Sequence, residues 1–372
     1  MSPEQKKTAN SPKPRTEILQ ISPYVQGKSQ ISGQANPIKL SSNESSFGPS
    51  PLAIDAYKSL ASSLHRYPDG SQLQLRQAIA DVHNLDPDKV ICGNGSDELL
   101  DLIYRAYLSA GDEIILSTNH FVMCALYAQI QGAKIVLAKE ANYLTIVDDL
   151  LSQVTDKTRM VTLANPNNPT GTYLNIEQIR QIHAGLPSSV LFVIDGAYAE
   201  YVITNDFDSG TSLVDSFDNV IVTRTFSKIY GMSSLRIGWA YCPTEIIDIL
   251  QRIRSPFNTN GPALAMAIEA VKDTKYIDSI KEHTAKWQKR LLEELSAIGI
   301  TVVPSVTNFY LLEFNQTEGK SAVEAAAFLE SDGLIPRLLT IANGDKVLRI
   351  TVGLDAENEA VINSLTKYML LF

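Results

Sequence analysis

A lysine that follows an apolar run carries the strongest chemical signal in the sequence. Lys228 lies in the stretch Arg224-Thr-Phe-Ser-Lys-Ile-Tyr-Gly-Met-Ser-Ser-Leu-Arg236. A partly desolvated lysine amine is a nucleophile that can form a Schiff base with an aldehyde. The hydroxyl groups of Thr225 and Ser227 and the guanidinium of Arg236 are groups that bind phosphate. The stretch therefore predicts an amine nucleophile beside a phosphate site, whereas a strand-end lysine alone would be a surface residue.

A carboxylate ends a second apolar run. Asp195 follows Val190–Ile194, and Tyr198 lies three residues further on. A carboxylate that leaves a buried strand needs a cationic partner, and a protonated pyridine nitrogen would provide one while keeping the ring an electron sink. The alternative interpretation is that Asp195 caps a helix. Tyr198 could bond a phenolic oxygen on the same ring, although taken alone it would be a core tyrosine.

Two polar turns complete the set of groups. Gly93-Asn-Gly-Ser-Asp97 opens a predicted helix at 97–109, where backbone N–H groups can bind phosphate. Asn165-Pro-Asn-Asn168-Pro-Thr-Gly171 follows a predicted strand at 159–164 and could place the Asn168 amide at a phenolic oxygen. A phosphate site, an amine, a ring-nitrogen carboxylate and a phenolic-oxygen pair are what pyridoxal 5′-phosphate (PLP) requires.

These residues need a sheet to position them. Apolar runs alternate with helical patterns, which predicts an α/β sheet covered on both faces, with ligands at the strand ends. The predicted strands are Val90–Cys92, Glu113–Leu116, Lys134–Leu137, Arg159–Ala164, Val190–Ile194, Val220–Thr223 and Ile237–Tyr241. A helical segment at 263–297 then leads to strands near 301–304, 308–313, 334–337 and 347–351. We expect a flexible arm at 1–16, a joining segment at 17–50, a large domain at 51–262 and a small α+β domain at 263–372.

Composition and charge exclude several classes of protein. The formal net charge is -9 and no long basic run occurs, so no nucleic-acid surface is expected. The three cysteines, Cys92, Cys124 and Cys242, lie far apart, so we expect no metal site. The N-terminus has no apolar core of a signal peptide and no stretch has about 18 apolar residues, so we expect a cytoplasmic protein without membrane spans.

The order of these motifs resembles fold-type I PLP enzymes of the aspartate aminotransferase superfamily, and the histidinol-phosphate aminotransferases (class II) in particular. The resemblance runs from about residue 20 to the C-terminus. Further matching stretches are Pro23-Tyr24-Val, Leu40-Ser-Ser-Asn43-Glu-Ser-Ser-Phe-Gly-Pro-Ser-Pro, Arg66-Tyr67-Pro-Asp-Gly70, Asn308-Phe and Leu348-Arg349-Ile-Thr-Val-Gly353. The resemblance implies a large domain with a mixed, mostly parallel seven-stranded sheet and a smaller α+β domain.

The resemblance also implies a role for each matched residue. Lys228 would form the internal aldimine and carry a proton between the substrate and the cofactor, Asp195 would pair with the pyridinium nitrogen, and Tyr198 would bond the phenolic oxygen with Asn168. The residues implied to hold the phosphate are Gly95, Ser96, Asp97, Thr225, Ser227 and Arg236, with Tyr67 reaching it from the other subunit of a homodimer. The residues implied at the substrate end are Tyr24, Asn43, Asn168, Arg337 and Arg349.

Three positions depart from the family pattern. Phe121 stands where a tyrosine usually stacks on the ring, and phenylalanine can still stack. Gly196 follows the aspartate where an acidic or small side chain is common, and Ser46 replaces a frequent proline. None of the three touches the proton transfer.

The implied reaction interconverts histidinol phosphate plus 2-oxoglutarate with imidazole-acetol phosphate plus glutamate, as in histidine biosynthesis. An aromatic amino-acid aminotransferase is the alternative, because imidazole, phenol and phenyl rings could occupy one slot. A phospho-amino-acid decarboxylase shares the scaffold. A PLP-sensing regulator would need an N-terminal helix-turn-helix, for which the roughly 20 polar residues before Pro23 are too few.

Overall fold

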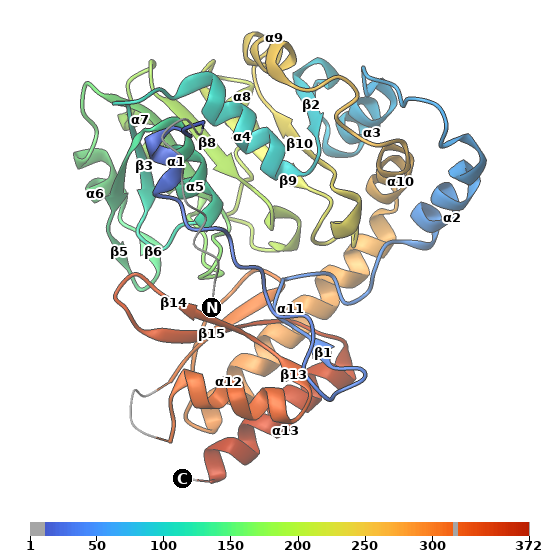
Figure 1. The fold of residues 1–372 in the computed structure, drawn as a ribbon, viewed down its shortest axis with the longest axis vertical. Coiled ribbons are helices and arrows are strands. Elements are labelled where there is room, and N and C mark those ends of the chain that lie inside the picture. Colours follow the sequence, from blue (N-terminus) through green and yellow to red (C-terminus); the bar gives the residue numbers. More distant parts are fainter. Residues whose placement is uncertain (1–11, 315–318, 372) are drawn as a thin grey trace.

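A computed structural model describes residues 12–314 and 319–371, and it has two domains of unequal size (Figure 1). The large domain contains a seven-stranded sheet in the order β2-β10-β9-β8-β7-β3-β4. Only β10 runs antiparallel to its neighbours, so the predicted mixed, mostly parallel sheet is confirmed. The strands are β2 (Val90–Gly93), β3 (Glu113–Ser117), β4 (Lys134–Ala138), β7 (Thr158–Ala164), β8 (Leu191–Asp195), β9 (Val220–Thr225) and β10 (Gly238–Tyr241).

Helices cover both faces of this sheet. Successive strand residues point to opposite sides, and the apolar ones on each side pack against helices. In β8, Phe192 and Ile194 enter one apolar core while Leu191 and Val193 enter the other. The first core is closed mainly by α3 (Leu73–His83), α7 (Ile176–Gly185) and α10 (Gly261–Lys272). The second is closed by α4 (Ser96–Tyr107), α5 (Val122–Gln131) and α9 (Thr244–Ile253). Burial on both faces explains the continuous apolar runs in the sequence.

The small domain has its own core around an antiparallel sheet in the order β11-β12-β15-β14. Its strands are β11 (Thr301–Val303), β12 (Phe309–Glu313), β14 (Arg337–Thr340) and β15 (Lys346–Thr351), and its helices are α11 (Thr274–Ala297), α12 (Ala322–Ser331) and α13 (Asp355–Leu370). An early strand, β1 (Ile38–Lys39), pairs in parallel with β13 (Leu334–Ile335). The segment just before the site loop at Ser41–Glu44 is thereby attached to the small domain.

Two sequence-based boundaries are wrong. The predicted helix at 263–297 is interrupted at Asp273, which separates α10 from α11 and accepts a hydrogen bond from the Tyr276 N–H at 3.4 Å as the N-cap of α11. The predicted strand at 334–337 divides into β13 and β14. Pro336 lies between them and has no N–H to continue a ladder.

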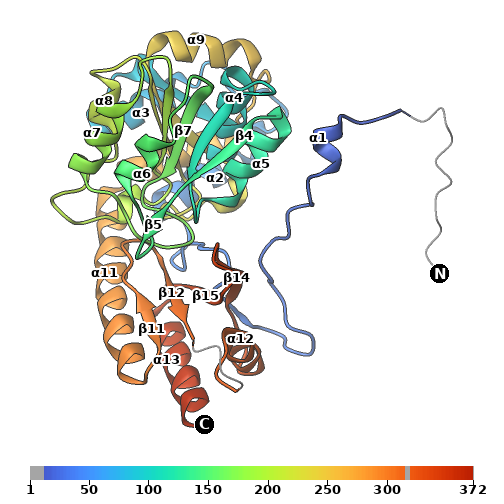
Figure 2. The same cartoon turned by 90° about the vertical axis from the view of Figure 1, so that its left-hand side faces the viewer.

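The N-terminal segment runs from the large domain to the small one (Figure 2). Arg15 donates to the Ile130 carbonyl at the end of α5 at 2.7 Å, and Lys28 pairs with Glu330 of α12 at 2.6 Å. Most of the predicted arm, residues 1–11, lies outside the described residues. The remaining short elements are α1 (Thr16–Leu19), α2 (Pro51–Leu60), β5 (Glu140–Ala141), β6 (Leu144–Thr145), α6 (Val147–Ser152) and α8 (Thr211–Val214). Within the described residues, no helix is long and apolar enough to cross a membrane.

Candidate active site

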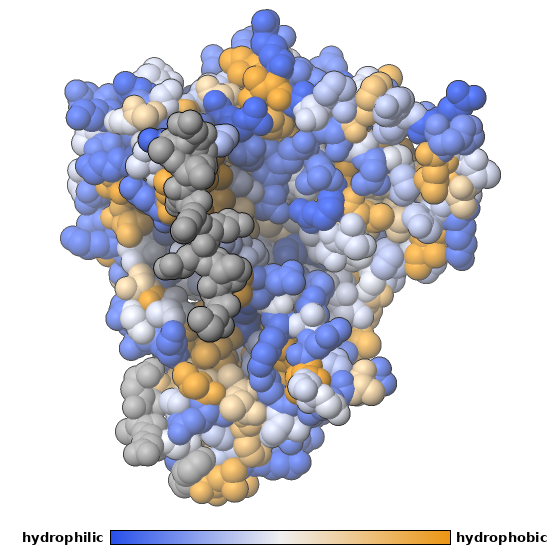
Figure 3. Space-filling model, in the orientation of Figure 1, coloured by the Kyte–Doolittle hydropathy of each residue, from blue (hydrophilic) through white to orange (hydrophobic). Residues whose placement is uncertain are grey.

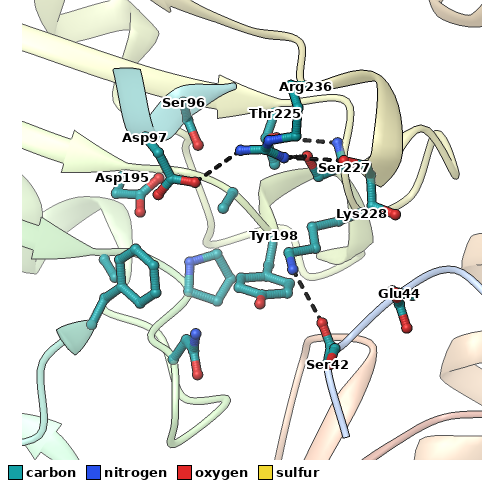
Figure 4. Close-up of a pocket in the computed structure, with 16 residues that line it drawn as sticks. Ser42, Glu44, Ser96, Asp97, Asp195, Tyr198, Thr225, Ser227, Lys228 and Arg236 are labelled. Carbon is teal, nitrogen blue, oxygen red and sulfur yellow. Dashed lines mark hydrogen bonds and ion pairs between the residues drawn. The ribbon is translucent and has the colours of Figure 1, made fainter. Parts of the chain in front are cut away.

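A cavity of about 240 Å³ lies where the carboxyl ends of β7, β8 and β9 face the segment that joins the small domain. Strand ends in such sheets are where ligands bind. Ten of the predicted residues line it: Ser96, Asp97, Phe121, Asn168, Asp195, Tyr198, Thr225, Ser227, Lys228 and Arg236 (Figure 4). Residues from five separate stretches of sequence therefore meet at one place.

One end of the cavity gathers groups of the kind that bind phosphate. The twelve-residue helix α4 begins at Ser96, and Arg236 lies against this N-terminus. The Arg236 guanidinium donates to Asp97 at 3.0 Å and to the Ser227 hydroxyl at 3.2 Å (Figure 4). Gly95 has a φ of 84°, and a Cβ there would lie 2.4 Å from the Arg236 Nη2 atom, so only glycine fits. N–H groups, hydroxyls and one guanidinium converge as a phosphate requires.

A buried carboxylate lies at the end of β8. Asp195 is 4% exposed and accepts a hydrogen bond from the Thr223 hydroxyl at 3.0 Å. Burial raises the pKa of Asp195 to about 6, while the bond from Thr223 opposes that rise. A carboxylate that loses its hydration in this way is stabilised by a cationic partner in the cavity. The structure thus supplies the anion that a protonated ring nitrogen needs.

Lys228 follows β9 and points into the cavity (Figure 4). Its Nζ atom donates to the Ser42 carbonyl oxygen at 3.5 Å and lies 5.6 Å from the centre of the Tyr198 ring. Ser42 belongs to the segment attached to the small domain, whereas Tyr198 follows β8. The amine is therefore held between the two domains, where a substrate would enter.

An arginine from the small domain reaches the same place. Arg349 of β15 donates through Nη1 to the Asn168 side-chain oxygen and through Nη2 to the Ser41 carbonyl at 3.1 Å. Burial lowers the pKa of Arg349, and its buried Nε–H has no hydrogen-bond partner among the described residues. A partly buried guanidinium with an unpartnered N–H favours an anionic ligand.

Besides Gly95 and Arg349, four predicted residues lie off the cavity lining. Tyr24 is 57% exposed, and Arg337 donates to the neighbouring Val25 carbonyl at 2.8 Å. Tyr67 is 82% exposed and stacks on Phe257 with ring centres 4.6 Å apart. Asn43 is buried, and its amide donates to the Tyr198 hydroxyl at 2.9 Å.

The comparisons with known proteins agree with this geometry. Residues 35–365 match the family model for aminotransferases of class I and II. A histidinol-phosphate aminotransferase from Rhodopseudomonas palustris is 47% identical over 359 residues, covering 96% of this chain and 98% of the relative. The chain belongs to the histidinol-phosphate aminotransferase family.

Solved structures of aminotransferases have the same fold. The histidinol-phosphate aminotransferase from Sinorhizobium meliloti, in complex with pyridoxal 5′-phosphate, aligns with a TM-score of 0.85 and 28% identity, covering 91% of this chain and 92% of that one. An aspartate aminotransferase double mutant from Thermus thermophilus aligns with a TM-score of 0.81 at 17% identity, covering 96% of this chain and all of that one. At that identity the second match concerns the fold alone.

The cofactor of this aminotransferase family is PLP, and the residues of this chain fit it. The phosphate cradle at Arg236 and the buried Asp195 carboxylate lie at separate parts of one cavity, as the phosphate and ring nitrogen of PLP do. Phe121 lines the same cavity and offers a ring for stacking. The departure from tyrosine at this position leaves an aromatic surface in place.

Sequence reasoning missed several residues of the site. Thr223, which bonds Asp195, lies two residues before Thr225 in β9, so the period of two in a strand could have found it. Ser42, Glu44 and Ser233 line the cavity from loops whose path the sequence did not indicate.

A buried ion pair behind the site was also missed. Arg224 and Glu200 are paired at 2.8 Å and their side chains are 7% and 5% exposed. They join β9 to the turn that carries Tyr198. A Cβ at Gly196 would lie 3.0 Å from the Arg224 Cδ atom, so a side chain there would crowd this ion pair.

Proposed function

We propose that this chain transfers the amino group between histidinol phosphate and 2-oxoglutarate, giving imidazole-acetol phosphate and glutamate. The observation that carries the proposal is the placement of the Lys228 amine in one cavity with a buried carboxylate, beside a partly buried arginine. The names of the relatives at up to 48% identity specify the substrate class. The aromatic alternative has no such support.

The cofactor-facing residues hold PLP by its phosphate, its ring nitrogen and its phenolic oxygen. When bound, PLP supplies an aldehyde that takes up the amino group and a ring that accepts the electrons of the broken Cα–H bond. Arg236 and the hydroxyls of Thr225 and Ser227 bind the phosphate. Asp195 would accept a hydrogen bond from the protonated ring nitrogen, and Tyr198 would donate one to the phenolic oxygen.

Lys228 carries the proton transfer. With cofactor and substrate bound, its Nζ would remove the proton from the substrate's Cα and return a proton to the carbon that bears the transferred nitrogen. The amine serves as base only while it is neutral, and its position between Ser42 and Tyr198 keeps it beside the reacting carbon.

Arg349 binds the anionic group of both substrates. Glutamate presents a carboxylate, whereas histidinol phosphate presents a phosphate ester, and a guanidinium fork suits both. Arg337 adds a second positive charge at this end, since the charges of the two arginines interact. A doubly charged phosphate gains more from two cations than a carboxylate does.

The test is a comparison of amino donors. The PLP-loaded protein is mixed separately with histidinol phosphate, tyrosine, phenylalanine and phosphothreonine, and the loss of the visible cofactor band is followed, with Lys228→Ala as the blank. Histidinol phosphate should react fastest. Equal or faster reaction with the aromatic acids would assign the chain to broad aromatic transamination, and no reaction with any donor would refute transamination.

We also propose that the working unit is a homodimer. Apolar side chains are exposed around α2, and Figure 3 shows them as orange patches on the right-hand side. They include Leu52, Ile54 and Leu64, with Tyr67 close in sequence. An exposed apolar group of this kind is typical of a protein interface. On this proposal Tyr67 crosses the interface to the partner's phosphate cradle.

Mixed dimers test the crossing of Tyr67. Lys228→Ala and Tyr67→Ala proteins are purified separately, unfolded together and refolded, and activity is measured per intact Lys228. A mixed dimer joins an intact Lys228 with an intact Tyr67 in one of its two sites. Activity above that of Tyr67→Ala alone is expected, and no gain in a sample shown to contain mixed dimers would contradict the proposal.

The proposed compartment is the cytoplasm. All three cysteines are buried and free. Burial raises the pKa of Cys92 to about 12, which leaves the thiol unreactive. Free core thiols suit a reducing compartment.

A further inference from the structure

Asn43 makes a contact that its predicted place at the substrate end does not explain. Its side chain is buried at 1% exposure, and its Nδ2 donates to the Tyr198 hydroxyl oxygen at 2.9 Å. It does not belong to the cavity lining, although Ser42 and Glu44 on either side do. Its backbone has a φ of 55°, a left-handed conformation that asparagine tolerates better than most residues.

The small domain holds Asn43 in this place. The Asn43 N–H donates to the Thr351 hydroxyl of β15 at 3.0 Å, and its carbonyl accepts from the Asn308 side chain at 3.1 Å. The Thr351 hydroxyl in turn donates to the Leu40 carbonyl at 2.9 Å. Tyr198, in contrast, belongs to the large domain. The Asn43–Tyr198 hydrogen bond therefore connects Thr351 and Asn308 of the small domain to a residue that lines the cavity.

The direction of this hydrogen bond decides what Tyr198 can do. A phenol has one proton to donate and an oxygen that accepts. When its oxygen accepts from the Asn43 amide, its own proton stays available for another acceptor. If Asn43 presented its oxygen instead, it would take that proton and leave Tyr198 without one to donate into the cavity.

We propose that Asn43 is a positioning residue that holds Tyr198 as a hydrogen-bond donor to the phenolic oxygen of PLP. Because Asn43 is fixed by Thr351 and Asn308, this donation depends on the small domain lying against the large one. The inference rests on the proposed use of PLP, and it is independent of which amino donor the enzyme prefers.

A pH titration without substrate tests the inference. Absorbance of the PLP-loaded protein gives the pH midpoint at which the C=N linkage between PLP and Lys228 loses its proton. A donated bond stabilises the negative phenolic oxygen, so losing it shifts the midpoint upward. Tyr198→Phe should raise the midpoint by about one unit or more. Asn43→Asp should raise it similarly, because an ionised carboxylate only accepts and takes the Tyr198 proton.

A double variant separates the hydrogen bond from the added charge. If Asn43→Asp acts through Tyr198, its effect should largely disappear in the Tyr198→Phe background. An equal shift in both backgrounds would mean that only the charge matters, and the inference would be overturned. An unchanged midpoint in Asn43→Asp would overturn it as well, since Asn43 would already be accepting the proton.

Asn43→Gly provides a variant that keeps the fold. Glycine adopts the left-handed conformation without strain, and the substitution removes the amide donor. Its midpoint should rise by less than that of Tyr198→Phe, and an unchanged midpoint would contradict the inference. A wild-type protein with no visible PLP band would refute the proposed function itself, so the two failures are distinct.

Discussion

The two ends of the site are built in different ways. At the cofactor end, Asp195, Thr225 and Ser227 are buried beside neighbouring strand ends of one sheet, where Lys228 also lies. At the substrate end, Arg349 and Arg337 come from the small domain and donate to carbonyls of the N-terminal segment, which also carries Tyr24. The cofactor end is a fixed framework, whereas the substrate end exists only when separate parts of the chain come together.

This difference indicates what each end can control. A preformed set of groups in a low-dielectric cavity stabilises charge without reorganising during the reaction. An end assembled from two domains can close on an anion and exclude water after binding. We therefore expect substitutions at the cofactor end to change the chemical step or the stability, and substitutions at the substrate end to change the apparent affinity.

The largest effect is expected for Lys228→Ala. This substitution removes the amine that we propose moves the proton at the substrate's Cα. The rate at which the amino donor reacts with the PLP-loaded protein should fall by at least about a thousand-fold, measured by stopped-flow absorbance. Lys289→Ala is a matched control, since that lysine is 78% exposed, and it should leave the rate unchanged. A loss below about ten-fold for Lys228→Ala would remove Lys228 from the mechanism.

The framework behind the cofactor end should be sensitive to loss of one ion-pair partner. Arg224→Ala leaves the buried Glu200 carboxylate without its cation, and this should lower the free energy of unfolding by about 3–5 kcal/mol. Urea unfolding gives the value. Asp55→Ala removes a surface pair with Lys58 and should cost less than about 1 kcal/mol. Equal costs for the two variants would mean that the cofactor end has no special framework.

The buried Asp195 predicts a pH dependence in the protein stripped of PLP. Its pKa is raised from 3.8 to about 6 by burial, so the folded state binds the proton more tightly than the unfolded chain does. That contribution to stability is complete below the unfolded pKa and is lost as pH rises through about 6. Compared with Asp195→Asn, the wild type should lose about 3 kcal/mol between low and neutral pH.

Urea unfolding of both proteins across this pH range checks the prediction. The difference in the free energy of unfolding should be constant above about pH 7 and shrink on acidification. Added PLP should restore the wild type at neutral pH, because a protonated ring nitrogen pairs with the carboxylate. A difference that does not vary with pH would show that Asp195 stays ionised in the cavity.

The smallest effect is expected at Arg337. This side chain interacts with the charge of Arg349, and among the described residues its hydrogen-bond partner is the Val25 carbonyl. Arg337→Gln should raise the KM for histidinol phosphate by about ten-fold, the value of one charge-assisted hydrogen bond, and leave kcat and the KM for glutamate nearly unchanged. Initial-rate kinetics with both substrates separates these outcomes. An effect mainly on kcat would place Arg337 at the reacting atoms instead.

The sequence indicated the residues that line the cavity better than the contacts made by the small domain, for a physical reason. Lys228 and Asp195 each follow a continuous apolar run, and parallel strands bring such ends to one edge of a sheet. The position of Asn43 against Tyr198 depends on the pairing of β1 with β13, which are about three hundred residues apart in the chain. No local sequence pattern predicts a contact between segments so far apart. The break at Asp273 was missed because the helical periodicity continues across it.

A comparison of histidinol phosphate with histidinol tests the central claim most directly. The two donors differ only in the phosphate, so the ratio of their kcat/KM values measures what the small-domain arginines contribute. We predict that wild type prefers histidinol phosphate by at least about a hundred-fold, and that Arg349→Gln removes most of this preference while cofactor binding stays intact. A preference that survives Arg349→Gln unchanged would contradict the assignment of the substrate's phosphate to the small-domain end.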